Sequence, residues 1–250
     1  IRCIGDPDER FLEDPVRMLR ALAHGARLGF RIDSPIHEAI GRHRATITQA
    51  APARLLEELY KILRSGAAER TFYRLFEVGL LKHISPELAR KQSAALWRSL
   101  AELDLYRARF ETAPSTLTNP VLLGSLLVPT HLLSPLPPET SRRRDRENDP
   151  RFTLGMLTLA RRDVQHLRQI VGLQQQLHDP GLPDRAQRAL MHREVYAEAL
   201  TWLEIHGGSS ATLERWRSLG EIGGAAIDRE AARPRRRRRR RRRGAKPARP

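Results

Sequence analysis

Apolar residues recur at intervals of three and four along most of this chain, and this spacing constrains its fold more than any other feature. Leu55, Leu59 and Ile62, for example, fall on one side of a helix with about 3.6 residues per turn. No stretch of useful length alternates apolar with polar residues, which is the pattern of a half-buried strand. The sequence therefore predicts an all-α fold without a β-sheet.

Local signals for helix starts and stops divide the chain into separate helices. Asp14 before Pro15 is typical of a helix start, and Gly29 is typical of a stop. Ser34 before Pro35 starts a second helix in the same way. These signals and the apolar spacing predict further helices over residues 52–65, 67–81, 87–110, 119–129, 152–178, 183–206 and 211–219.

The helix that begins near Asp14 separates apolar and basic side chains onto two faces. Met18, Leu19 and Leu22 belong to its apolar stripe. The basic stripe, at steps of three and four, consists of Arg17, Arg20, His24 and Arg27. This helix is predicted to pack on one face and to present cations on the other. A solvated basic face on an ordinary amphipathic helix is the alternative interpretation.

Most of the positive charge of the chain lies at its C-terminal end. The formal net charge is +16, and residues 233–250 contain twelve Lys or Arg and no acid, which leaves +4 for the rest. Such a tail indicates a polyanionic partner such as nucleic acid. From residue 223 on, the chain cannot bury enough apolar surface to fold, so we expect disorder there. The candidate RNA-binding residues are Arg235, Arg236, Arg237, Arg238, Arg239, Arg240, Arg241, Arg242 and Arg243.

Cysteine usage and the apolar runs indicate the cellular setting. Cys3 is the single cysteine, so no disulfide framework exists, and we expect a reducing, cytoplasmic compartment. The first residues do not form a signal peptide. The longest apolar run, over residues 121–128, is too short to span a bilayer. We therefore expect no membrane partner.

Two stretches resemble bacterial poly(A) polymerases and CCA-adding enzymes, the class II nucleotidyltransferases. Residues 5–29 resemble their neck segment, whose pattern is G-[DN]-P-x-x-R-[FY]-x-E-D-x-x-R-x-x-R-A-x-R-F-A-A-x-L-G. The chain departs from it at Ala23, His24 and Gly25, where the family has Arg, Phe and Ala. Residues 54–61 resemble the R-x-x-x-E-x-x-K helix that follows the neck. The run of arginines at the end resembles the poly(A) polymerase branch.

This resemblance implies roles for individual residues. Asp14 and Arg17 would contact the adenine of ATP, the expected substrate, and Arg10 and Arg20 would be further nucleotide-binding residues. The residues that brace the neck would be Arg54, Glu58 and Lys61. A ladder of helical ion pairs is the alternative interpretation of these last three.

The resemblance and the composition together imply an all-α array of neck and body helices with a disordered basic tail. The predicted parts are a nucleotide- and RNA-binding neck, a helical body, a charged proline-rich loop, a C-terminal helical region and the tail. Their expected ranges are residues 1–66, 67–133, 134–151, 152–222 and 223–250.

The family's catalytic motifs are not found in this sequence. Family members hold Mg²⁺ at the triphosphate with a D-x-D pair that follows a G-G-x-x-R turn. Asp6-Pro7-Asp8 has the spacing, but we expect it in a turn of the neck and reject it as a metal site. We therefore expect Mg²⁺ only in a head domain missing from this sequence. The chain alone is expected to hold no catalytic or metal-binding residue and to be inactive.

The implied function is that of the C-terminal portion of a polynucleotide adenylyltransferase, which adds AMP from ATP to RNA 3′ ends. We expect a monomer. Two alternatives stay open: a fragment of a CCA-adding tRNA nucleotidyltransferase, and a non-catalytic RNA-binding module derived from the family. The neck motif serves both chemistries, and the arginine-rich tail favours adenylation.

Overall fold

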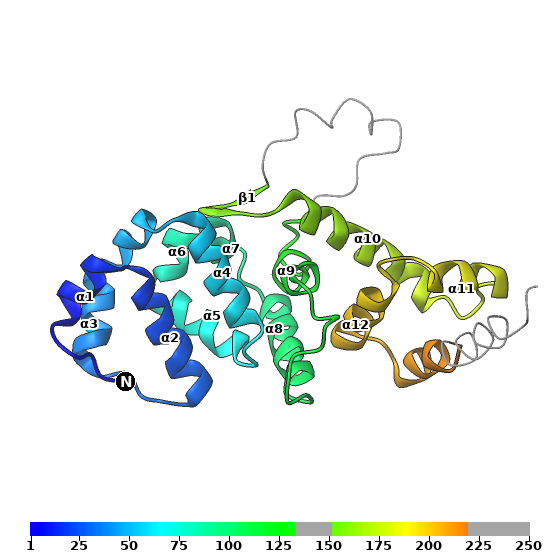
Figure 1. The fold of residues 1–250 in the computed structure, drawn as a ribbon, viewed down its shortest axis with the longest axis horizontal. Helices are drawn as coiled ribbons and strands as arrows, with labels where there is room; N and C mark the ends of the chain where they lie inside the picture. The colour runs from blue at the N-terminus through cyan, green and yellow to red at the C-terminus, as the bar shows by residue number, and fades with distance from the viewer. Residues whose placement is uncertain (134–151, 220–250) are drawn as a thin grey trace, which may run out of the picture.

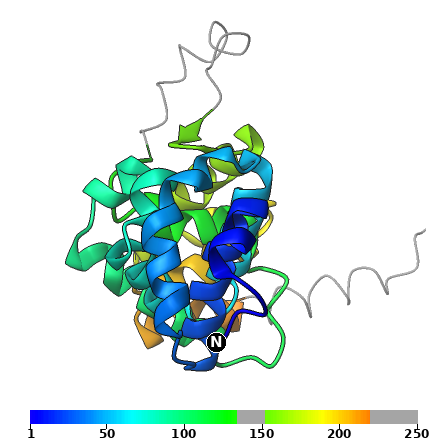
Figure 2. The ribbon, with the colours of Figure 1, turned by 90° about the vertical axis from the view of Figure 1, so that its left-hand side faces the viewer.

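The computed structural model describes residues 1–133 and 152–219, in which helices follow one another along an elongated array (Figure 1). The all-α prediction is confirmed, except for one two-stranded hairpin. Seen from the end that carries α1 and α3, the later helices lie behind them (Figure 2). The predicted loop over residues 134–151 and the predicted tail, including residues 235–243, lie outside the described residues.

Asp6-Pro7-Asp8, which we expected in a turn, begins helix α1 (Pro7–Glu13) instead. Asp6 is the N-cap, and its carboxylate accepts a hydrogen bond from the Asp8 amide at 2.9 Å. Proline at the first helical position lacks the amide hydrogen that would have no partner there. The prediction of a turn was wrong because the residue types that favour turns also start helices.

The next helices begin and end close to the predicted signals. α2 (Val16–Leu28) follows Asp14 and Pro15 and ends before Gly29. α3 (Ser34–His43) and α4 (Pro52–Leu63) each carry proline in their first turn. Between them lies a 3₁₀ helix, η1 (Arg44–Gln49), which the apolar spacing did not predict.

Two helices expected as single elements are each broken in the structure. The range 67–81 contains α5 (Ala68–Glu77) and only the start of α6 (Leu80–Ile84), separated at Gly79, which has a φ of +73°. The range 87–110 contains the end of α7 (Pro86–Arg90) and α8 (Ala94–Arg107). The break before α8 comes from Ser93, which is extended and caps α8 by accepting from the Leu96 amide at 3.2 Å.

Residues 153–158, expected as the start of a long helix, form a hairpin of β1 (Thr153–Leu154) and β2 (Leu157–Thr158). The two leucines pair across the strands and are buried. Residues three apart face the same side both in a helix and across a two-residue hairpin turn, so their spacing could not separate the two structures. Gly155 favours the hairpin over a helix, because its φ is +60° and a Cβ there would lie 2.5 Å from the carbonyl oxygen of Ile84.

The helices that follow the hairpin pack beside α8 and α9 (Asn119–Leu127). α10 (Arg161–His178) is followed by α11 (Asp184–Met191) and α12 (Tyr196–His206). A turn over residues 192–195 divides the last two, which we expected as one helix. Residues 210–219 are helical, as predicted.

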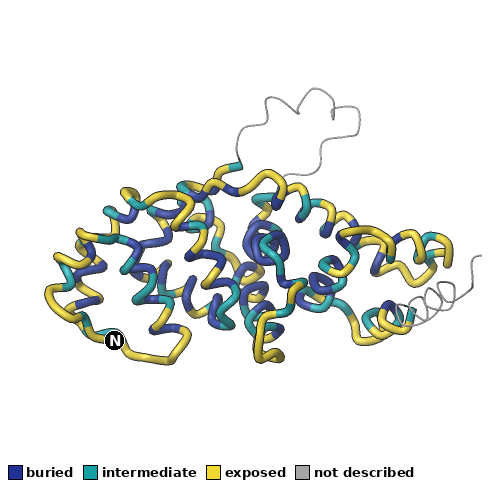
Figure 3. The backbone as a smooth tube through the Cα atoms, viewed as in Figure 1, coloured by how far each residue is buried: buried dark blue, intermediate teal, exposed yellow. Residues whose placement is uncertain are grey.

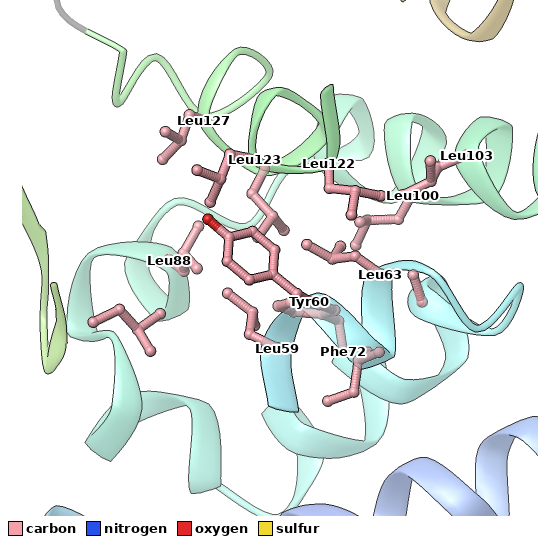
Figure 4. Close-up of a cluster of buried hydrophobic side chains, with 14 of the residues drawn as sticks. Leu59, Tyr60, Leu63, Phe72, Leu88, Leu100, Leu103, Leu122, Leu123 and Leu127 are labelled. Carbon is pink, nitrogen blue, oxygen red and sulfur yellow. The ribbon is translucent and has the colours of Figure 1, made fainter. Parts of the chain in front are cut away.

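Buried apolar side chains form one continuous core along the array, with exposed residues on its outer faces (Figure 3). It contains Phe11 near one end and Trp216 near the other, so it crosses the predicted neck and body boundaries, which themselves stay a prediction. Figure 4 shows the Tyr60 ring of α4 among leucines from α4, α7, α8 and α9. Burial raises the pKa of the Tyr60 hydroxyl above its usual value. This packing fixes α4 against α7, α8 and α9.

Candidate nucleic-acid interface

Two acidic residues at the junction of α1 and α2 bind arginines. Asp14 Oδ2 accepts a hydrogen bond from Nη2 of Arg54 on α4 at 2.6 Å. Glu13 Oε2 accepts from Nη1 of Arg17 at 2.7 Å and from Nη1 of Arg10 at 3.1 Å. The hydrogen bond from Arg17, and next that from Arg10, hold the pKa of Glu13 below its usual value. The structure thus places Asp14, Arg17 and Arg10 at one helix junction, where Asp14 pairs with Arg54 and Glu13 pairs with both Arg17 and Arg10.

Asp14 and Arg17 differ in their exposure and in the hydrogen-bonding capacity that remains free for a ligand. The Asp14 side chain is 16% exposed, and its Oδ1 also accepts from the amide of Val16 at 3.2 Å. Each carboxylate oxygen has two lone pairs, so Asp14 keeps some capacity to accept hydrogen bonds. Arg17 is 40% exposed and uses Nη1 alone for its contacts with Glu13 and with the carbonyl of Arg10.

Glu58 on α4 is buried and is held by two cations. Its Oε1 accepts from Nη2 of Arg20 on α2 at 2.7 Å and from Nζ of Lys61 at 3.1 Å. Burial by itself would raise the pKa of Glu58, but the hydrogen bonds from Arg20 and Lys61 outweigh it and leave the pKa below its usual value. The carboxylate is therefore ionised at neutral pH and connects α2 to α4.

The predicted bracing residues do not form a single ladder along α4. Lys61 contacts Glu58 within the helix, but Arg54 extends to Asp14 at the start of α2. Two cross-helix ion pairs result, between Asp14 and Arg54 and between Arg20 and Glu58. Their geometry is that of a brace between α2 and α4, and their functional roles stay a prediction.

A cleft of about 550 Å³ opens beside this brace, between α2 and α4. Ala23, His24 and Arg27 line it from α2 together with Arg20. Its cationic lining residues are Arg20, Arg27, Lys61, Arg64 and Arg107, against the single carboxylate of Glu58. His24 and Arg27 are exposed and have no ion-pair or hydrogen-bond partner among the described residues. The cleft therefore offers positive charge that the fold does not neutralise.

The far wall of the cleft consists of two arginines that the sequence reasoning did not single out. Arg64 lies over the Tyr60 ring, with its guanidinium carbon 5.6 Å from the ring centroid, and donates to the side chain of Asn119. Arg107 donates from Nε to the carbonyl of Arg64 at 3.2 Å and from Nη1 to that of Phe110 at 2.6 Å. Arg107 is 43 residues beyond Arg64, so no local pattern connects the two.

The three departures from the family pattern have structural counterparts. Ala23 and His24 line the cleft, where a larger residue at position 23 would take up space. Gly25 packs against α5, and a Cβ there would lie 2.7 Å from Nη1 of Arg74 and 3.1 Å from Cγ1 of Ile32. Gly25 therefore makes room for the Arg74 side chain.

Metal sites and membrane spans were both sought in the described ranges. Within residues 1–133 and 152–219, no group of three or more His, Cys, Asp or Glu side chains could hold a metal ion. In the same ranges, no helix combines the length and apolarity needed to cross a membrane.

Known proteins match the N-terminal region of the chain, which includes part of the lining of this cleft. Residues 29–92 match the family described as "Probable RNA and SrmB- binding site of polymerase A". Poly(A) polymerase I of Escherichia coli O157:H7 is 42% identical over 90 residues, which are 36% of this chain and 19% of that protein. The CCA-adding enzyme of Bacillus licheniformis is 36% identical over 96 residues, which are 38% of this chain and 24% of that enzyme. The chain thus spans about a fifth of the length of the curated relatives it matches. Through this N-terminal region, the chain is homologous to bacterial poly(A) polymerase I and CCA-adding enzymes.

Proposed function

We propose that this chain supplies RNA binding and base selection to a bacterial polynucleotide adenylyltransferase, which adds AMP from ATP to RNA 3′ ends. The observation that carries the proposal is the cleft between α2 and α4. Its lining has five Lys or Arg side chains and one carboxylate, and Arg27 has no partner among the described residues. A cationic groove of this kind binds the phosphates of a single strand.

The nucleotide would bind at the N-terminal end of the same helix. Arg17 and Arg27 are ten residues apart, which corresponds to about 15 Å along a helix axis. An RNA strand in the cleft would therefore place one of its ends near Asp14 and Arg17, and the proposed reaction requires this to be the 3′ end. The run of arginines over residues 235–243 would add affinity that depends on salt and not on sequence.

Asp14 and Arg17 suit adenine through their opposite hydrogen-bonding roles. A carboxylate accepts hydrogen bonds, and a guanidinium donates them. The Watson–Crick edge of adenine, like that of cytosine, offers an amino donor beside a ring-nitrogen acceptor. Guanine and uracil present a carbonyl in place of the amino group, and each mispaired group costs about 1–3 kcal/mol in a closed site. The pair would therefore accept A or C and disfavour G and U.

Addition of CCA to tRNA is the second candidate, because CCA-adding enzymes match the same region. Both activities need A or C at the base-selecting site, so Asp14 and Arg17 do not separate them. The basic tail favours adenylation. In either case, Mg²⁺ and the D-x-D pair that carries out nucleotide transfer would belong to a catalytic head, and this chain would bind the substrates.

Charge reversal at Arg27 tests the cleft. Arg27→Glu should weaken binding of a labelled oligoadenylate and reduce the slope of log affinity against log salt by about 0.7, the loss of one phosphate contact on a single strand. Arg185→Glu on α11 is the matched control, because Arg185 is also exposed and the change in net charge is the same. Fluorescence anisotropy across a salt series measures both quantities. Equal affinities and slopes for the two variants would exclude the cleft as the RNA site.

A further inference from the structure

An aromatic pair lies at the surface between α5 and α8. The rings of Tyr73 and Trp97 meet edge to face, with centroids 5.8 Å apart and planes at 67°. Tyr73 is 51% exposed, and Trp97 is partly exposed. They line a second cleft, of about 470 Å³, in which apolar surface predominates. The two rings therefore have surface that a ligand could contact.

Trp97 is also the accessible indole of the chain. The other two tryptophans, Trp202 and Trp216, are 6% and 0% exposed and belong to the core. Trp97 therefore differs from them in being open to a ligand that stacks on its ring.

The charges around the pair exclude a site that works by net attraction. Arg70 and Arg74 line this cleft, but so do Glu69 and Glu77, so the formal charges cancel. Nη1 of Arg74 is buried and has no hydrogen-bond partner among the described residues. Because this atom is buried beside Gly25, the cleft offers a ligand chiefly the two ring surfaces, and it does not offer the surplus charge that binds a run of phosphates.

We propose that Tyr73 and Trp97 form a stacking site for an unpaired base of the RNA that this chain binds. The inference rests on the proposed function. RNA is the occupant we favour because a flat base can stack on an exposed ring. Tyr73 also falls within the residues that match the family described as "Probable RNA and SrmB- binding site of polymerase A", and Trp97 lies just beyond them. Aromatic side chains stack on any base, so the site contributes affinity without sequence preference. It complements the cleft between α2 and α4, which acts through phosphates.

The experiment uses the full chain and two readouts, tryptophan fluorescence and anisotropy of a labelled oligoadenylate. Stacking on Trp97 should quench the fluorescence, whereas polyphosphate, which has no bases, should leave it unchanged. Trp97→Phe should abolish the quenching but retain most of the affinity. Trp97→Leu and Tyr73→Leu should each weaken binding about tenfold without changing the salt slope, because stacking is worth roughly 5- to 100-fold per base. Tyr73→Phe keeps the ring and should bind like the original chain.

The outcomes separate this proposal from the one on which it rests. If RNA binds with a slope that Arg27→Glu reduces, but without quenching and without effect of either leucine variant, the stacking site is wrong and the proposed function stands. A purely protein-binding role for this surface would give the same result. If the original chain fails to bind RNA, the proposed function itself fails. Circular dichroism of the two leucine variants, taken separately, tests whether each retains the helical fold, and the affinity of a variant that retains it decides the outcome.

Discussion

His206, at the end of α12, makes the stability of this chain depend on pH. Its Nε2 lies 3.1 Å from Oγ of Ser125 on α9, and its Nδ1 lies 3.3 Å from Oε2 of Glu102 on α8. The imidazole packs against the Trp202 ring at 4.1 Å between centroids. Burial lowers the pKa of His206 to about 3, because the charged form would lose its hydration. Neutral His206 therefore joins three helices, accepting from Ser125 and donating to Glu102.

The sign and size of the pH effect follow from this shift. The pKa of His206 is about 3 in the folded chain and 6.5 when it is free of the fold, so the unfolded chain binds the proton more tightly. The free energy of unfolding is therefore highest above pH 6.5 and falls as the pH drops toward 3. Each pH unit below 6.5 costs about 1.4 kcal/mol. Between pH 7.5 and pH 5.0, His206 should remove about 2 kcal/mol of stability.

Urea unfolding followed by circular dichroism at pH 7.5, 6.0 and 5.0 measures this loss. His206→Gln keeps a polar side chain that does not titrate, so its stability should change by about 2 kcal/mol less over the same range. His37→Gln is the control, since it makes the same substitution at an exposed histidine. Carboxylates whose pKa is lowered by the fold, such as those of Asp8 and Glu58, change the stability mainly at pH values below 5.0. An equal loss in the original chain and in His206→Gln would refute the argument, as would a gain of stability toward pH 5.

Two other changes test the neck and the body. With a catalytic head of the family joined to the chain, Asp14→Asn and Arg17→Ala should each sharply reduce ATP use and discrimination against GTP. Asparagine can still accept the hydrogen bond from the Val16 amide, so Asp14→Asn should keep the fold. Unchanged nucleotide preference in both variants would show that the two residues do not select the base. Asp104→Ala removes the acceptor for two backbone amides at the start of α5, at 2.8 and 2.9 Å. It should lower the free energy of unfolding by about 1–2 kcal/mol in urea, and a change near zero would show that water caps this helix equally well.

Helix type and most helix starts could be predicted from the sequence because they depend on residues close together in the chain. Three local features act within one or two turns: the hydrogen bond from the Val16 amide to Asp14, the prolines in the first turns of α3 and α4, and the apolar stripe of α2. The residues that gather at the junction of α1 and α2 were identified through the resemblance to the family's neck motif, which occupies one short stretch of the chain. In residues 153–158, a spacing of three between apolar residues is compatible with both a helix and a hairpin, and the prediction of a helix there was wrong.

Which side chains pair with each other, and where clefts form, depend on the tertiary structure alone. Arg54 binds Asp14, forty residues away, rather than Glu58 on its own helix. Arg107 joins the wall of the cleft through the carbonyl of Arg64. The sequence shows which side of a helix carries charge, but the crossing of two helices determines which charges meet and where space is left between them. That crossing is set by the packing of the whole core, so the brace and both clefts emerge only when all the helices are in place.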